Sequence, residues 1–385
     1  DGSGIKRFPH AGLAHQRLAF LDVSEKASQP FSSHDGRYWI VFNGEIYNFP
    51  DLKRRLIDTG LFVSTSDTEV LLRAFIEWGP DALHELNGMF AFAIWDTLSR
   101  KLFCARDRLG VKPFHYFYDG NTFIFASEIK ALLVHPRVTR SVDPRAISDY
   151  LSLGYIAGDK TIFSGIRKLL PGHLLEFSPD KKPETREYWD LPQDIVINPA
   201  EVSNGVRKRL EAACQARLIS DVPIGFFLSG GVDSSSIVGY AQRHHPQLAT
   251  FSLGFETSEF SELGAAERFS REHSAKSHSV MFSAPDEALL RRIAWFYDQP
   301  FGDTSSVPTF KLCEFTSRFV KVALSGDGGD EMFGGYETNR ADLAAAARQQ
   351  LRRRILVEVQ LPLLPAAHQQ LIVIHVRPVV VAAVG

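Results

Sequence analysis

Two glycine-rich strings in the second half of the chain hold the residue types that bind phosphate. The first, Ser229-Gly230-Gly231-Val232-Asp233-Ser234-Ser235, lies between an apolar run at 222–228 and a helical pattern at 234–244. Glycines let backbone N–H groups approach an anion, and the positive end of the following helix points at the same place. The spacing lacks the G-x-x-x-x-G-K-S/T pattern, which excludes a Walker-type loop. A plain helix-capping turn is the alternative for this string alone.

The second string, Ser325-Gly326-Asp327-Gly328-Gly329-Asp330-Glu331, follows an apolar run at 320–324. Open parallel sheets bind ligands at the carboxyl ends of their strands, where both strings are expected. Three acidic groups in one loop repel each other and need cations, which suits magnesium and pyrophosphate. A surface acidic turn is the alternative, and the presence of the first string argues against it.

With four strings in the first half, these loops make the chain resemble the glutamine-hydrolysing asparagine synthases. The four are His15-Gln16-Arg17-Leu18, Asn43-Gly44-Glu45-Ile46-Tyr47-Asn48, Ser66-Asp67-Thr68-Glu69 and the run from Ala105 to Phe114. The resemblance covers nearly all of residues 1–340. It implies an α+β N-terminal-nucleophile domain of αββα type, the class II glutamine amidotransferase. An α/β Rossmann-like ATP-pyrophosphatase domain with a parallel sheet would follow it.

The resemblance also implies roles in the ligase half, where ATP would be cleaved between its α and β phosphates and aspartate activated as an acyl-AMP. The residues expected to hold pyrophosphate are Ser229, Gly230, Gly231, Asp233 and Ser234. Asp330 would help through Mg²⁺, so Asp233 and Asp330 are the expected metal ligands. Leu253 would line the adenine pocket, and Ser325 and Gly326 would contact the nucleotide. Asp327 falls where the family has an acidic residue, Glu in some members, needed to form β-aspartyl-AMP.

Glutamine would bind in the first half, through groups that suit its charges. Arg17 offers a permanently charged fork to the α-carboxylate, and Glu45 and Asp67 can take the α-ammonium. The Asn43 side chain and the Gly44 backbone N–H can stabilise the oxyanion formed during amide hydrolysis. The Asn-Gly pair alone predicts a hairpin turn, and such a turn could still aim an N–H at the substrate.

The family's nucleophile is a cysteine at the mature N-terminus, and the resemblance places Asp1 roughly thirty residues inside that domain. We therefore expect a fragment that lacks this nucleophile and the family's C-terminal helical part with its pyrophosphate-binding lysine. Cys104 follows Phe103 in a predicted strand and is expected in the core. No catalytic nucleophile is assigned.

Simple periodicities predict the elements that carry these residues. Strands are expected at 38–42, 90–96, 101–106 and 122–127, a helix opened by Pro50 and another that starts near Asp67. In the second half, strands at 222–228, 249–255 and 320–324 alternate with helices, which predicts a parallel sheet. The expected domains are 1–182 and 201–340, joined by a linker at 183–200 and followed by an atypical tail at 341–385.

Composition restricts the partners. With 44% hydrophobic and 23% charged residues and a net charge of −2, the chain matches an ordinary globular protein with no strong attraction to nucleic acid or membranes. Its three cysteines form no C-x-x-C pair, which favours a reducing, cytoplasmic location. The expected partners are glutamine, aspartate and ATP, and a homodimer stays open.

Two other functions remain open at this point. The same two half-reactions could amidate another carboxylate, such as a carboxylated sugar or a peptide intermediate. The chain could also be a non-catalytic fragment that binds glutamine and nucleotide without turnover.

Overall fold

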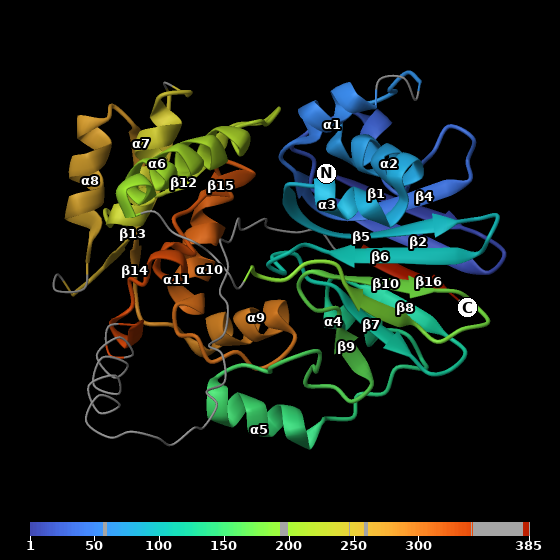
Figure 1. Cartoon of the computed structure of the whole chain (residues 1–385). Coiled ribbons are helices and arrows are strands. Elements are labelled where there is room, and N and C mark those ends of the chain that lie inside the picture. Colours follow the sequence, from blue (N-terminus) through green and yellow to red (C-terminus); the bar gives the residue numbers. More distant parts are fainter. Residues whose placement is uncertain are drawn as a thin grey trace, which may run out of the picture.

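The computed structural model describes residues 1–56, 60–192, 199–245, 247–257, 261–339, 341 and 380–384. They form two domains that lie side by side, one built from the first half of the chain and one from the second (Figure 1). The C-terminal strand is the exception, because it joins a sheet of the first domain.

The first domain contains two sheets. In one, the strand order is β11-β10-β6-β5-β4-β3, and its neighbouring strands run antiparallel. Its strands are β3 Phe31–Ser32, β4 Tyr38–Ile46, β5 Gly88–Asp96, β6 Lys101–Arg106, β10 His173–Phe177 and β11 Glu184–Glu187. The other sheet, in the order β1-β2-β16-β8-β7-β9, consists of β1 Gly2–Arg7, β2 Ala11–Arg17, β7 His115–Tyr118, β8 Phe123–Ala126, β9 Ile166–Lys168 and β16 Val380–Val384.

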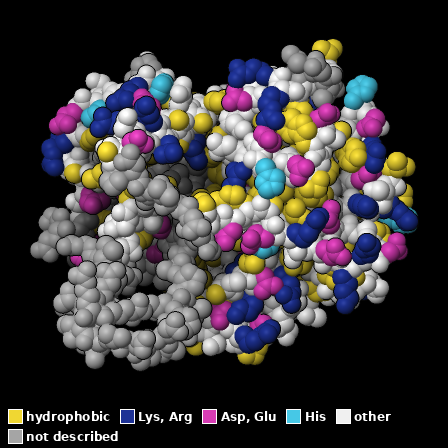
Figure 2. Space-filling model, viewed as in Figure 1, with side chains coloured by type: hydrophobic (Ala, Val, Ile, Leu, Met, Phe, Trp, Pro, Cys, Tyr) yellow, Lys and Arg dark blue, Asp and Glu magenta, His cyan; other side chains and the backbone are white. Residues whose placement is uncertain are grey.

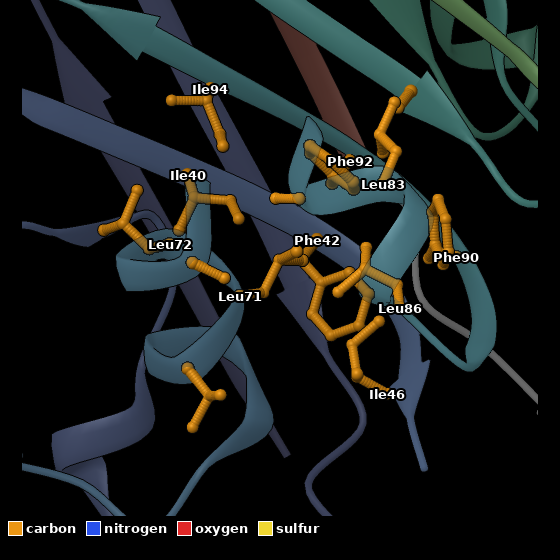
Figure 3. Close-up of a cluster of buried hydrophobic side chains, with 14 of the residues drawn as sticks. Ile40, Phe42, Ile46, Leu71, Leu72, Leu83, Leu86, Phe90, Phe92 and Ile94 are labelled. Atoms are coloured by element: carbon orange, nitrogen blue, oxygen red, sulfur yellow. The ribbon is translucent and has the colours of Figure 1, made fainter. Parts of the chain in front are cut away.

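Helices cover the outer faces of both sheets. Those of the first domain are α1 Phe49–Arg55, α2 Asp67–Trp78, α3 Ala82–Glu85, α4 Ile129–Leu132 and α5 Pro144–Leu153, with short 3₁₀ turns at Glu25–Ala27 and Gly79–Asp81. Figure 3 shows side chains of α2 and α3 packed on Ile40, Phe42 and Ile46 of β4. The alternate residues of these strands pack against the second sheet. Side chains of α4 cover the far face of that sheet. The predicted αββα arrangement is confirmed.

The second domain has a four-stranded sheet in the order β14-β13-β12-β15. Its strands run parallel, as predicted. Its strands are β12 Ile224–Phe227, β13 Ala249–Phe255, β14 Lys276–Phe282 and β15 Val322–Leu324. The helices are α6 Pro199–Ala216, α7 Val232–Gln242, α8 Leu263–Glu272, α9 Glu287–Tyr297, α10 Ser306–Thr316 and α11 Gly329–Phe333. Thr250 bonds to Ser270 of α8, while the next residue, Phe251, contacts Phe315 of α10. Helices therefore cover both faces of the sheet.

Several predicted bounds match closely. Strands β6 and β13 have the predicted limits, Pro50 lies in the first turn of α1, and α2 begins at Asp67 behind the cap residue Ser66. Residues Glu184–Glu187, inside the predicted 183–200 linker, form β11, and residues 380–384 of the predicted tail form β16.

The predicted turn at Asn43-Gly44 is wrong. Both residues lie within β4, paired with Ala91 and Phe90 of β5. A side chain at Gly44 would meet the carbonyl oxygen of Met89 at 2.1 Å, so close backbone approach, rather than a turn, requires glycine here.

The visible surface mixes charges of both signs over both domains (Figure 2). Within the part of the chain that the structure describes, no helix is long and apolar enough to cross a membrane.

Candidate functional site

A pocket in the first domain brings together four of the predicted glutamine-binding residues. Arg17, Asn43, Gly44 and Asp67 all line it. They come from the end of β2, the middle of β4 and the first turn of α2, so two strands and a helix N-terminus meet here. The pocket therefore joins a cation, an anion and an amide donor at one site.

Arg17 is held by the loop that follows its strand. Its guanidinium donates hydrogen bonds to the carbonyl oxygens of Leu21 and Ser24, each at 2.9 Å, and to that of Asp22. Partial burial lowers the pKa of Arg17, while the carboxylates of Asp22 and Asp67 oppose the shift. The fork is thus fixed in place before a substrate binds, which reduces the entropy lost on binding.

The two predicted ammonium ligands lie in different positions. Asp67 lines the pocket, accepts a 3.0 Å hydrogen bond from the Ile46 N–H, and has its pKa raised to about 6 by burial. Glu45 is buried and is not among the lining residues. Burial and the nearby Asp67 raise its pKa well above the usual value, against the pull of Arg217 and Lys112. Asp67 is therefore the better placed of the two to meet a ligand directly.

Asn43 is buried, and its Nδ2 donates to the Ser127 hydroxyl at 3.2 Å. An amide nitrogen carries two hydrogens, so Asn43 can hold Ser127 and still offer an N–H to the pocket. Ser127 directly follows β8, a strand of the other sheet of the domain. Its role could not be read from the Asn-Gly string.

Other lining residues were not assigned from sequence. Lys112 is buried, and this burial lowers its pKa to about 8, with Asp107 and Glu45 acting in the opposite direction. His15 is also buried, its Nε2 lies 3.1 Å from the Phe42 carbonyl oxygen, and burial lowers its pKa to about 4. Both lie in strings that carry the resemblance, which was the one signal available for them.

In the second domain the two glycine-rich loops pack directly on each other. A side chain at Gly326 would meet the Ser234 backbone nitrogen at 2.6 Å, and one at Gly329 would meet the Asp233 carboxylate carbon at 2.5 Å. Each loop follows a parallel strand, β12 or β15, and these strands are neighbours. The prediction that both loops meet at the carboxyl edge of the sheet is confirmed.

The first loop is organised by its own hydroxyl groups. The Ser229 N–H donates to the Ser234 hydroxyl at 3.2 Å, and the two hydroxyls lie 3.0 Å apart. Gly230 has a φ of +91° and passes so close to α8 that a side chain would meet Ala265 at 2.8 Å. Gly231 is the N-terminal cap residue of α7 and makes no side-chain hydrogen bond. The first backbone N–H groups of this helix therefore receive no acceptor from the cap side chain.

Acidic side chains gather beside this helix end. Burial, followed by the charges of Asp330 and Glu331, raises the pKa of Asp233. Asp327 accepts a 3.0 Å hydrogen bond from the Ser325 hydroxyl, and its pKa is raised by burial and by Glu331. A bound cation would relieve the repulsion between these carboxylates. Glu331 is one of them, and no role was assigned to it from the sequence.

The predicted adenine contact, Leu253, lies on β13 opposite Val280 of β14 and is half-buried. A second pocket opens at the end of β14, lined by Val280, Met281 and Phe282 with side chains of α9 and α10. Leu253 does not line this pocket, nor do the residues of the two loops.

Magnesium fits the loops only together with a substrate. Within the described ranges, no three His, Cys, Asp or Glu side chains form a group that would hold a metal by themselves. The charge of Asp330 raises the pKa of Asp233, and Mg²⁺ typically binds through one or two carboxylates plus substrate phosphates and water. The acidic group therefore suits Mg²⁺ bound to a nucleotide.

Cys104 is fully buried in the core between the two sheets, and burial raises its pKa well above the usual value. The expectation that it belongs to the core is confirmed. Cys104 is not among the residues that line the pocket.

Comparison with protein families gives two matches along the chain. A glutamine amidotransferase domain family matches residues 1–189, and the asparagine synthase family matches residues 205–373. The first range covers the first domain from β1 to β11, and the second begins within α6 of the second domain.

Individual relatives match across both domains. A Methanocaldococcus jannaschii protein, provisionally named a glutamine-hydrolysing asparagine synthetase 2, is 40% identical over 85% of this chain and 67% of its own length. The Bacillus subtilis asparagine synthetase (glutamine-hydrolysing) 1 is 36% identical over 89% of this chain and 55% of its own. A Gibberella zeae protein named amidase chry2 is 32% identical over 86% of this chain and 52% of its own. The chain thus spans about half to two thirds of the length of these relatives.

Proposed function

Because the chain belongs to the glutamine-hydrolysing asparagine synthetase family, we propose that it acts in glutamine-dependent synthesis of asparagine from aspartate and ATP. The observation that carries this proposal is the contact between the two glycine-rich loops, which places acidic residues beside a helix end at the carboxyl edge of a parallel sheet. The glutamine pocket in the other domain supports the second half-reaction.

In the second domain, the loop that begins at Ser229 would bind the pyrophosphate part of ATP. Its serine hydroxyls and the N-terminal end of α7 supply donors, and Gly230 lets the backbone turn beside α8. Ser325 and Gly326 would hold the nucleotide, with Leu253 against the adenine. The aspartate side chain would then attack the α-phosphate, and AMP would later leave as ammonia adds.

Mg²⁺ would be held by Asp233 and Asp330 together with phosphate oxygens. When bound, it would neutralise charge on the departing pyrophosphate. Asp327 would help to form the acyl-AMP, and its hydrogen bond from Ser325 fixes its carboxylate next to the nucleotide contact.

In the first domain, Arg17 would bind the α-carboxylate of glutamine and Asp67 its α-ammonium, with Glu45 as a second, buried carboxyl group near Asp67. The Asn43 amide and the Gly44 N–H would stabilise the oxyanion. With the family's N-terminal cysteine in place to attack the amide, ammonia released there would pass through the protein to the acyl-AMP in the second domain.

The proposal is tested by ATP–pyrophosphate exchange with a panel of carboxylic acids, which includes aspartate and glutamate. Exchange that needs aspartate supports the proposal. Exchange that needs a different acid would show that the chain activates another carboxylate as the acceptor of ammonia. This outcome is included because one relative is named an amidase. Absence of exchange with every acid would contradict an active ligase half.

A further inference from the structure

The loop Phe20–Ser24 forms the support on which Arg17 rests. Three of its carbonyl oxygens, those of Leu21, Asp22 and Ser24, accept hydrogen bonds from the guanidinium. Phe20 and Leu21 also line the pocket. The position of Arg17 therefore depends on the conformation of this loop.

Asp22 is the central residue of the loop. It is buried and has a φ of +47°, a left-handed conformation that a non-glycine residue adopts only when its surroundings hold it there. Its carboxylate accepts hydrogen bonds from the Ser24 backbone and, at 2.7 Å, from the Thr65 N–H. Thr65 directly precedes the cap residue of α2, the helix that carries Asp67. Asp22 therefore contacts both Arg17 and the segment that leads to Asp67.

Two further hydrogen bonds of this loop come from the other domain. The Asp22 N–H donates to the carboxylate of Asp221 at 2.7 Å, and the Asp221 N–H donates to the Phe20 carbonyl oxygen at 2.8 Å. These two bonds close a ring between segments 199 residues apart. Three residues after Asp221, β12 begins and leads into the phosphate loop.

Two further contacts surround this ring. The guanidinium of Arg217, at the end of α6, lies over the Tyr47 ring with its carbon 4.2 Å from the ring centre. Phe20 and Leu21 share one apolar cluster with Ile224 and Phe226 of β12. The segment 217–226 thus packs against the loop Phe20–Ser24 and Tyr47 through apolar, cation–π and hydrogen-bonded contacts.

We propose that Asp221 is a positioning residue of the glutamine pocket, supplied by the nucleotide domain. It holds Asp22 in its left-handed conformation, and Asp22 in turn fixes the carbonyl groups that orient Arg17. The proposal rests on the proposed function, because it takes Arg17 as the group that binds the glutamine carboxylate.

Calorimetric titration of glutamine and of ATP into three variants tests this role. Asp221→Ala removes the acceptor and should weaken glutamine binding about tenfold, as for loss of one charge-assisted hydrogen bond, with ATP binding within about twofold of the unmodified chain. Asp221→Asn keeps an acceptor oxygen and should restore glutamine binding to within about threefold. Gln299→Ala is the matched control, because the Gln299 side chain accepts from the Ile162 N–H across the same two domains.

Hydrogen exchange gives a readout that needs no ligand. Backbone amides of residues 20–24 should exchange faster in Asp221→Ala than in Gln299→Ala, with equal midpoints of thermal unfolding. If the unmodified chain fails to bind glutamine while exchange responds as expected, the glutaminase assignment is wrong and the positioning contact stands. Unchanged exchange, or unchanged glutamine affinity in Asp221→Ala, would overturn the inference.

Discussion

At the scale of single residues, the pocket contains side chains whose hydrogen bonds define their orientation. The guanidinium of Arg17 donates hydrogen bonds to three carbonyl oxygens. A side chain of equal charge but different shape could not make the same three bonds.

Arg17→Lys should weaken glutamine binding by about tenfold or more, because an ammonium keeps the charge but not the planar group that the three carbonyl oxygens hold in place. Affinity for ATP should stay unchanged. Calorimetric titration of both ligands measures this difference. The matched control is Arg37→Lys, which alters a similar fork bound to both oxygens of Asp96 elsewhere in the domain. Equal glutamine affinity in the two variants would argue against Arg17 as the carboxylate ligand.

Glutamine binding should depend on pH through Asp67. Burial raises the pKa of this carboxyl to about 6 in the free protein, and a bound ammonium favours the ionised form and lowers the pKa. Binding should therefore release protons near pH 6, and affinity should be roughly tenfold lower at pH 5 than at pH 7. Titration in buffers of different ionisation enthalpy detects the protons. Asp67→Asn should bind weakly and lack the step near pH 6, and persistence of that step would assign it to another group.

At the scale of elements, glycine positions decide how closely the phosphate loop can pack. Gly230→Ala would force an unfavourable φ and a contact of 2.8 Å with Ala265 and with the Ala266 nitrogen. We expect the variant to lose at least about 1 kcal/mol of stability and to bind ATP more weakly.

The control lies in the helix after this loop. Gly239, within α7, would find no atom within 4 Å of an added side chain, so Gly239→Ala should leave ATP binding unchanged and stabilise the domain by about 0.5–1 kcal/mol. Denaturant unfolding and ATP titration measure both effects. Equal behaviour of the two variants would show that the loop does not need its left-handed glycine.

Elements with a continuous apolar pattern could be predicted from sequence, and others could not. The run Ala249–Phe255 gave β13 its correct limits. Strand β14 was missed because its side chains alternate between exposed and half-buried, which leaves no apolar run to detect. Asn43-Gly44 was misread because a local turn signal does not reveal the strand β5 that approaches it. The ring between Asp22 and Asp221 joins residues 199 apart and has no local signature.

At the scale of the whole molecule, the two proposed sites lie in separate domains, and the contacts between these domains include those of the segment 217–226 with the first domain. The ligase half should consume free ammonia, so its chemistry can be measured without the glutaminase half. Asp327→Asn should then lose synthesis of the acyl-AMP while glutamine binding in the other domain stays within about twofold. Rates of ATP–pyrophosphate exchange and glutamine titration check the two sites independently. A variant that lost both, while folded, would argue for one shared site.

In the proposed reaction, the side-chain carboxylate of aspartate becomes bonded to AMP. Aspartate labelled with ¹⁸O in that carboxylate, supplied with ATP and ammonia, tests this step directly by mass spectrometry of the products. We expect one ¹⁸O atom in the phosphate of AMP, together with asparagine and unlabelled pyrophosphate. Label in inorganic phosphate accompanied by ADP, or no labelled product at all, would contradict it.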